Sequence, residues 1–345
     1  MNIKKIGLSA LAGSLAMVSA NAVELAISGK TEVTYMKKDL TPTGNPFGMG
    51  NAITFSGSGD VNGMTATYTS VIQDGGTANS NTSEVFASSS LMLDMGDMGT
   101  IGFDQGVGSF GVSTIDDKMP YAYEEANYGS GGSNGLRAAS GAMNVLGYKN
   151  TISDILVSVE LNPGSGATAN SGTAAATTAT GDGGSTGAAG ATNSGYNIAV
   201  TGSPMDGVNA GIGYGKEEST DVKNAGTGND EKFKTAYATY AIQGITLGYQ
   251  RSEGTGGKTG LASNSVEMYG VSFSVNENIA ISYNVIDNEY GKVSATDVTE
   301  ESTGMGASYT MGSASIRAVA NKTDNVGGAL NTNEEAMEIS LMLAF

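Results

Sequence analysis

The sequence predicts an all-β fold, a sixteen-stranded antiparallel transmembrane β-barrel, from three observations. Segments of about 8 to 12 residues alternate between apolar and polar side chains, which is the period of a strand with two unlike faces. Sixteen such segments follow one another, and an even number suits an antiparallel barrel. The connections alternate between a few residues and a long polar stretch, which is typical of a barrel with short periplasmic turns and long external loops.

The first and last segments show the alternation most clearly. In "VELAISGKTEVTY" (23–35) the side chains of Leu25 and Ile27 share one face, while Lys30 and Glu32 share the other. In "EEAMEISLMLAF" the alternation continues as far as Phe345. In a closed barrel the apolar face meets lipid and the polar face lines water, so we expect the interior to need no hydrophobic core.

The other strands are expected in the same rhythm. In chain order their sequences are "ITFSGSG", "MTATYTSVI", "EVFASSSLMLDM", "TIGFDQ", "AMNVLGYK", "DILVSVEL", "GYNIAVTG", "GVNAGIGYG", "KTAYATYAI", "ITLGYQR", "VEMYGVSFSV", "IAISYNVID", "TGMGASYTM" and "SASIRAVAN". The long connections are expected at 37–50, 74–83, 105–140, 162–194, 216–231, 252–264, 288–300 and 321–335. The stretch 162–194 is a low-complexity sequence of Gly, Ala, Thr and Ser, which predicts an external loop.

The amino end predicts export. Lys4 and Lys5 precede an apolar run over 6–18, and Ala20, Asn21 and Ala22 follow it. This is the layout of a secretory signal peptide with small residues before the cleavage site, and the run is too short for a membrane-spanning helix. We therefore expect a signal peptide over 1–22 and a single barrel domain over 23–345.

Composition excludes several kinds of chemistry. The chain has no Cys and no His, so it has no disulfide, no Ser-His-Asp or Cys-His catalytic arrangement and no histidine-based zinc site. The formal net charge of −17 argues against a nucleic-acid partner. Carboxylate-only catalysis needs a positioned acid pair, and no pattern here positions one. We expect a protein that is not an enzyme.

No cofactor is predicted. The acid clusters leave Ca²⁺ binding through oxygen ligands open, but no segment has the spacing of a dedicated calcium loop.

On these features the chain resembles the general bacterial porins of Gram-negative outer membranes. The resemblance rests on the signal peptide, the sixteen strands, the loop rhythm, the ending "EISLMLAF" and the stretch "GTIGFDQG" (99–106). It implies an outer-membrane location in contact with lipid, passive diffusion of small hydrophilic solutes and ions, and a homotrimer. It also implies that the last strand pairs with the first, and that Phe345 is the recognition signal for the outer-membrane assembly machinery.

In the porin family the third long loop folds into the barrel and narrows the pore. For loop 105–140 the resemblance implies that Asp116, Asp117, Glu124 and Glu125 project acid into this constriction. The alternative is that the four acids belong to a solvated surface loop. An acidic passage favours cations, because charge rings set the selectivity of a pore.

The resemblance also implies basic residues on the barrel wall opposite the acids. The chain has only three arginines, Arg137, Arg251 and Arg317, so few basic residues are available for such a cluster. Arg317 shares the polar face of its strand. Lys30, Glu32 and Lys149 share the polar faces of theirs. We expect these four, Lys30, Glu32, Lys149 and Arg317, on the pore wall. The family's usual turn in this loop is absent.

Three other functions stay open. A substrate-selective channel would carry an aromatic track on inward positions, which the pattern does not show. A secreted β-rich surface or adhesion protein would show internal repeats, and no fixed period is present. A barrel serving only as an anchor or receptor fits the same strand pattern.

Overall fold

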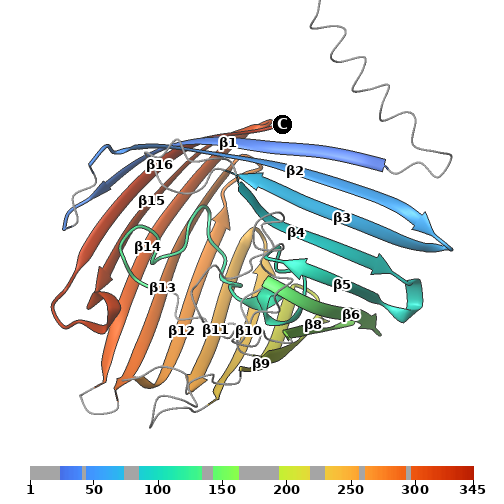
Figure 1. The fold of residues 1–345 in the computed structure, drawn as a ribbon. Helices are drawn as coiled ribbons and strands as arrows, with labels where there is room; N and C mark the ends of the chain where they lie inside the picture. Colours follow the sequence, from blue (N-terminus) through green and yellow to red (C-terminus); the bar gives the residue numbers. More distant parts are fainter. Residues whose placement is uncertain are drawn as a thin grey trace, which may run out of the picture.

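The structure, a computed structural model, describes residues 24–40, 44–73, 85–133, 143–162, 194–217, 230–255, 261–292 and 297–345. These residues form a closed barrel of sixteen antiparallel strands, β1 to β16, each hydrogen-bonded to its neighbours in the sequence (Figure 1). The predicted fold class is confirmed. The expected signal peptide over 1–22 and nearly all of the low-complexity loop over 162–194 lie outside the described residues.

The strands have these bounds: β1 Glu24–Lys38, β2 Phe47–Val61, β3 Met64–Gln73, β4 Val85–Asp94, β5 Thr100–Gln105, β6 Met143–Ile152, β7 Ile155–Asn162, β8 Gly195–Met205, β9 Val208–Glu217, β10 Glu231–Ile242, β11 Ile245–Thr255, β12 Leu261–Ser274, β13 Ile279–Lys292, β14 Val298–Met311, β15 Ala314–Asp324 and β16 Glu334–Ala344. Short 3₁₀ helices lie at η1 Gly96–Met98, η2 Gly111–Ile115 and η4 Val326–Gly328. No helix of the described residues is long and apolar enough to span a membrane.

The barrel closes between β1 and β16, as the resemblance implies. Lys30 lies opposite Ala344, and the pairing continues to Lys38 opposite Ala336. The backbones of Gly29 and Phe345 exchange two hydrogen bonds, of 2.7 and 2.9 Å. In Figure 1 the carboxyl end accordingly lies beside β1. Closure pairs the edge strands that an open sheet would leave with unsatisfied backbone groups.

Tight turns join the strands at one rim. Asn62 and Gly63 both have positive φ, of 55° and 82°, and Gln243 and Gly244 have 49° and 82°. Two positive φ values in succession match the right-handed twist of a two-residue hairpin, which is why a glycine occupies the second position. The Asp60 carboxylate accepts a hydrogen bond from the Gly63 backbone N–H at 3.1 Å and closes the first of these turns.

Several strands extend further toward the long loops than predicted. The connection expected over 288–300 is shorter, because β13 continues to Lys292 and β14 begins at Val298. The outward side chains in this part include Asp287, Glu289 and Glu301, so the apolar alternation stops while the backbone ladder continues. The hydrophobic pattern therefore marks the apolar band of the barrel, which is shorter than its strands.

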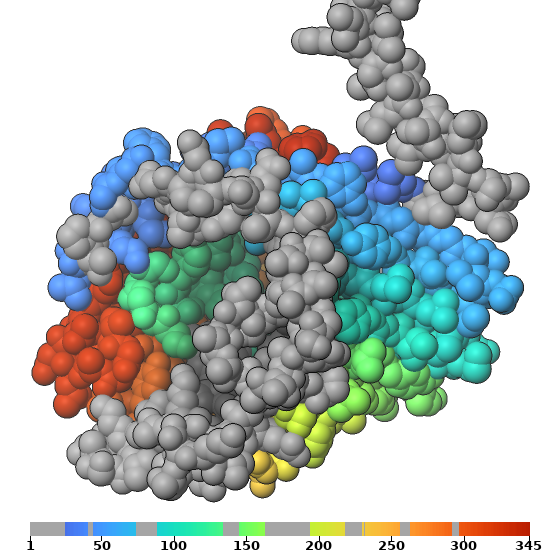
Figure 2. Space-filling model, in the orientation of Figure 1, coloured from blue at the N-terminus to red at the C-terminus, as the bar shows by residue number. Residues whose placement is uncertain are grey.

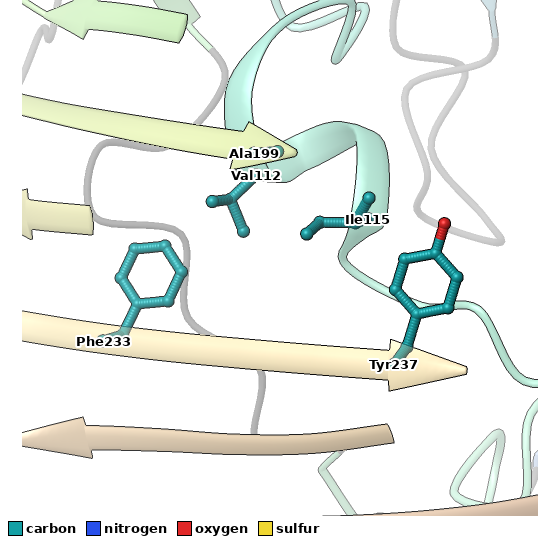
Figure 3. Packing of buried hydrophobic residues seen from close by; sticks show 5 residues of the cluster. All are labelled: Val112, Ile115, Ala199, Phe233 and Tyr237. Carbon is teal, nitrogen blue, oxygen red and sulfur yellow. The ribbon is translucent and has the colours of Figure 1, made fainter. Parts of the chain in front are cut away.

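Loop 106–133 lies inside the barrel, and its packing corrects one expectation. The interior contains two apolar clusters, which the alternation of a water-lined wall does not predict. In the first, Val112 and Ile115 of the loop pack against Ala199, Phe233 and Tyr237 of the wall (Figure 3). In the second, Met119 and Ala126 of the loop meet the wall residues Val266, Met268 and Ile286. The buried apolar side chains of these two clusters lie on the wall where the loop covers it.

Candidate functional site: the loop inside the barrel

The loop enters the barrel through a turn built around Asp104 at the end of β5. The Asp104 side chain is fully buried, and its carboxylate accepts hydrogen bonds from the backbone N–H groups of Val107, at 2.7 Å, and Ser109, at 2.8 Å. Gly106 and Gly108 have φ of 88° and 78°, which side chains disfavour. The carboxylate and the two glycines together turn the chain inward.

Phe110 anchors the first part of the loop. Its side chain is 0% exposed, and its ring fills the space that the absent side chains of Gly102 and Gly147 leave on the wall. The ammonium of Lys149 lies 5.4 Å from the centre of this ring and 3.5 Å from the carbonyl oxygen of Ser109. Lys149 therefore points inward, as expected, and contacts the base of the loop.

Polar side chains of the wall bind the loop backbone as it passes them. Hydroxyl and amide oxygens accept from loop N–H groups, and amide N–H groups of the wall donate to loop carbonyls. The contacts are Gly111 N–H to Ser158 (2.8 Å), Val112 N–H to Asn197 (2.8 Å), Lys118 N–H to Gln250 (3.0 Å), Ala122 N–H to Ser282 (2.8 Å) and Asn284 to the Pro120 carbonyl (2.9 Å). Each hydrogen bond satisfies a backbone group that burial would otherwise leave unpaired. The loop is therefore bound to the inner wall of the barrel along this part of its length.

The last part of the loop is bound in the same way near β14 to β16. Asn321 donates to the carbonyl oxygens of Glu125 and Tyr128, both at 2.8 Å. The Ser133 N–H donates to the Glu300 carboxylate at 2.7 Å. Figure 2 shows this part of the loop, in green, in the mouth of the barrel between the blue first strands and the red last strands.

Tyr123 forms the central contact of the loop. Its hydroxyl lies 2.9 Å from the Glu32 carboxylate of β1 and within hydrogen-bonding distance of the Glu338 carboxylate of β16. Arg317 of β15 pairs with Glu32 and donates to the Ser340 hydroxyl at 3.2 Å. Burial and the neighbouring Glu338 raise the pKa of Tyr123, so the phenol keeps the proton that it donates.

Glu124 lies in the electrostatic field of this group. Burial, followed by the charges of Glu338 and Glu32, raises the pKa of Glu124 to about 7, while Arg317 and Lys30 act in the opposite direction. A carboxyl group with this pKa changes charge near neutral pH, because its ionised form is poorly solvated and faces like charges.

The other predicted acids lie elsewhere. Asp116 and Asp117 follow η2, where Gln250 donates to the Asp116 carbonyl at 3.1 Å. The Asp117 carboxylate accepts from the Met119 N–H at 2.9 Å. Burial is the main cause that raises the pKa of Asp116, and the charge of Asp117 adds to it. These two acids stabilise the turn after η2 and are not part of the Tyr123 group.

Four residues of the predicted set lie close together in the structure: Lys30, Glu32, Glu124 and Arg317. Three others lie apart from this group: Asp116, Asp117 and Lys149. Glu125 contributes its backbone carbonyl to the seat of the loop. The role of these residues in a constriction stays a prediction.

Sequence reasoning missed Tyr123 and Glu338 as members of the group. Strand parity could have indicated Glu338, since it shares the inward face of β16 with Ser340. Nothing in the local sequence places Tyr123 against it. Arg251, considered as a basic residue, faces outward and pairs with Glu253 and Glu267.

In the parts of the chain that the structure describes, no group of three or more acidic side chains is arranged to hold a metal ion. The absence of a cofactor stays a prediction, and calcium binding stays the open alternative.

Comparison with known proteins supports the fold. No protein-family model matches the chain, and no curated protein matches it either. Among solved structures, the chain is similar to Salmonella typhi OmpF in complex with daunomycin, with a TM-score of 0.69 and 12% identity over 94% of this chain and 98% of that chain. It is also similar to the Rh. blastica porin in a triply substituted form (TM-score 0.59, 13% identity, 93% and 100% covered). A third is the trimer form of Vibrio cholerae OmpT, an outer membrane protein (TM-score 0.64, 10% identity, 94% and 99% covered). At these identities the likeness concerns the porin fold.

Proposed function

We propose that this protein is an outer-membrane porin, a water-filled pore for passive diffusion of small hydrophilic solutes and ions with a preference for cations. The observation that carries the proposal is the loop over 106–133, which lies along the inner wall of a closed barrel. A loop in this place narrows the interior of a pore. Diffusion through such a passage requires no catalytic residue. The polar lining replaces part of the hydration of a solute, and the loop sets limits of size and charge.

The outer surface supports a membrane location. Large apolar side chains project outward along the strands, for example Ile27 (59% exposed) and Leu341 (47%). An apolar surface of this extent is unfavourable in water and indicates contact with another apolar phase. A lipid bilayer is such a phase, and a closed barrel can cross it because all of its strands are hydrogen-bonded to neighbours. The outward Tyr249 and Tyr269 rings, with centroids 5.2 Å apart, lie next to the charged side chains of Arg251 and Glu267. Tyrosines beside charges suit the interface between acyl chains and headgroups.

The preference for cations is supported by the group around Tyr123. Three carboxyl groups, those of Glu32, Glu124 and Glu338, lie there with two basic groups, those of Arg317 and Lys30. A surplus of acid at the narrowest part attracts cations and repels anions of the same size.

Trimer formation and assembly are the remaining parts of the proposal. A homotrimer is supported by the porin fold and by the trimeric form of one similar structure. A role of Phe345 as the signal for the assembly machinery is supported by its place in the closing strand pair, where its ring lies over Gly29. The partners are then outer-membrane lipid, the assembly machinery, two further copies of this chain and small solutes.

The test is reconstitution of the protein over 23–345 in a planar lipid bilayer. We expect stepwise, ohmic openings and a reversal potential in a KCl gradient that indicates cation preference. A folded, inserted barrel without conductance would contradict the channel function and favour an anchor or receptor.

A substrate-selective channel is the second candidate, and one observation favours it. Tyr121 and Tyr128 of the loop each expose 38% of their side chains, and aromatic faces of this kind bind sugars or organic cations. Saturation of the flux with rising solute concentration, measured by liposome swelling, would distinguish selective binding from free diffusion.

A further inference from the structure

The connection between β15 and β16 is an ordered loop that is hydrogen-bonded to itself. We call its residues 325–333 the outer loop. The Val326 N–H donates to the Thr332 carbonyl at 2.8 Å, and the Asn331 N–H donates to the Asn325 side chain at 3.0 Å. Because these bonds join its two halves, a force on one part of the outer loop displaces the whole of it.

The last residues of the inner loop, 129–133, pack between the outer loop and the wall. A Cβ on Gly131 would lie 3.2 Å from a methyl group of Val326, so the two backbones approach closely there. Ser130 is fully buried, and its hydroxyl lies 2.6 Å from that of Thr323 on β15. In Figure 2 this end of the inner loop, in green, borders the red last part of the chain.

Glu300 of β14 binds both loops through one carboxylate. Its side chain is 1% exposed. Oε1 accepts a hydrogen bond from the Ser133 N–H of the inner loop at 2.7 Å, and Oε2 accepts one from the Gly327 N–H of the outer loop. No Lys or Arg in the described ranges forms an ion pair with Glu300. A buried carboxylate is costly unless its oxygens are hydrogen-bonded, so each loop stabilises the anion that holds the other.

We propose that Glu300 couples the two loops, so that a displacement of the outer loop is transmitted to residues 129–133 and changes the current through the pore. The coupling goes beyond the proposed channel function, because it exists in the folded barrel whether or not ions pass. When the outer loop withdraws the Gly327 N–H, the buried anion loses one of its two donors. It regains solvation by moving toward water, which releases the Ser133 N–H as well. Coupling between two sites requires such a shared element, whose position both of them bias.

The first experiment disturbs the outer loop and measures the inner one. In Gly328→Ala the new methyl would lie 3.0 Å from the Tyr290 ring, at a φ of 74° that side chains disfavour. Hydrogen exchange of the amides of 129–133 should accelerate about tenfold or more, as expected for the loss of a hydrogen bond to a charged group. Gly312→Ala is the matched control, because Gly312 has a φ of 60° in the turn between β14 and β15 and its methyl would meet no atom within 4 Å.

Glu300→Gln should interrupt the transmission. The amide oxygen can replace one of the two acceptors, but the amide NH₂ group cannot accept from a backbone N–H. We expect faster exchange in both loops, and no further acceleration at 129–133 when Gly328→Ala is added. Glu301→Gln, at the neighbouring outward position, should leave both loops as in the wild type. Exchange at 129–133 that stays at the wild-type rate in Gly328→Ala would overturn the coupling. Acceleration by Gly328→Ala that persists in the Glu300→Gln background would exclude Glu300 as its route.

A load on the exposed tip of the outer loop tests the consequence for the channel. Leu330 is 67% exposed and the chain has no Cys, so Leu330→Cys introduces a single thiol. After reaction with a biotin maleimide, streptavidin is added in planar bilayers. We expect streptavidin to change the single-channel current of Leu330→Cys and to have no effect when Glu300→Gln is also present.

Two results would contradict this expectation. No change of current in Leu330→Cys would show that the outer loop does not act on the pore. An equal change with and without Glu300→Gln would show that streptavidin merely covers the mouth of the barrel. A folded barrel that does not conduct would overturn the channel function instead, while the hydrogen-exchange comparison would still decide the coupling.

Discussion

The guanidinium of Arg317 lies over the ring of Tyr123, 4.3 Å from its centre. The same Tyr123 reaches Glu32 of β1 and Glu338 of β16 with its hydroxyl, and these are the two strands that close the barrel. One loop side chain thus contacts both sides of the closing seam, and Arg317 covers it from β15. This arrangement binds the middle of the loop to the place where the first and last strands meet.

Removal of the Tyr123 hydroxyl should loosen the loop. In Tyr123→Phe, Glu32 and Glu338 lose a shared donor, which costs about 1–3 kcal/mol for buried groups. We expect hydrogen exchange of the loop amides near residues 119–128 to accelerate about tenfold or more. Tyr283→Phe is the control, because Tyr283 faces outward and is 46% exposed. Equal protection of the loop in both variants would contradict the role of Tyr123 as its anchor.

Loss of the Arg317 charge should strengthen the preference for cations. Arg317→Met removes the guanidinium that pairs with Glu32 and leaves Lys30 as the basic residue near the acids of the Tyr123 group. The cation-to-anion permeability ratio should rise by about twofold or more in a KCl gradient. Arg251→Met is the matched control, since Arg251 faces outward. A ratio unchanged in Arg317→Met would place the ion path away from this group.

Cation preference should depend on pH through Glu124. Its pKa of about 7 exceeds the ordinary 4.5, so the side chain takes up a proton as the pH falls through 7. The preference for cations should therefore weaken between pH 8 and pH 6, and reversal potentials measured over this range provide the test. The folded chain binds this proton more tightly than the unfolded chain does. The contribution of Glu124 to the free energy of unfolding is therefore lowest above pH 7 and rises as the pH falls toward 4.5.

Glu124→Gln should abolish that pH dependence and hold the permeability ratio near the wild-type value at low pH. Glu277→Gln is a suitable comparison, because Glu277 is exposed in the turn between β12 and β13. A profile in Glu124→Gln that still falls between pH 8 and 6 would assign the titration to another group.

A single methyl group should disturb the loop from the wall side. In Gly147→Ala the new methyl would overlap the ring of Phe110, which is fully buried, so Phe110 must move. Overpacking of this kind costs about 1–3 kcal/mol. We expect a lower thermal midpoint and noisier single-channel currents. In Gly50→Ala the methyl would meet no atom within 4 Å, so this variant should behave as the wild type. A Gly147→Ala variant with the thermal midpoint and the single-channel currents of the wild type would show that Phe110 does not hold the loop.

Assembly should depend on the Phe345 side chain. The ring is 69% exposed and lies over Gly29, so its removal costs the finished barrel little. We therefore expect Phe345→Ala to lower the amount of barrel in outer membranes while the purified protein refolds normally in detergent. Leu343→Ala, on the same face of β16, is the comparison. Wild-type amounts of Phe345→Ala in the membrane would contradict the assembly role.

The sequence predicted the barrel because its alternation has a direct physical cause. Leu25 and Ile27 face outward while Lys30 and Glu32 face inward, and one strand period decides both. The strand ends were less predictable, since charged outward residues such as Glu289 interrupt the apolar pattern while the hydrogen-bond ladder continues.

The candidate site was predictable only in part. Parity placed Arg317 and Glu32 inside, but their pairing joins strands 285 residues apart in sequence and depends on the closure of the barrel. The inward Phe233 and Val266 contradict a purely polar lining, because the loop that buries them is distant in sequence. Which loop residue meets which wall residue follows from the path of the loop, and no local period encodes that path.

Because the loop packs against only part of the inner wall, the inward residues of the barrel differ in how freely they can be substituted. Beneath the loop, an inward residue such as Ser302 or Asn197 is part of a packed interior, and a change in its size or polarity displaces a partner. On β2 and β3 an inward residue such as Thr67 is half-exposed, and no contact with the loop is found among the described residues. Channels of this kind can therefore acquire new solute preferences by substitution along two strands, while the remainder of the inner wall maintains the shape of the passage.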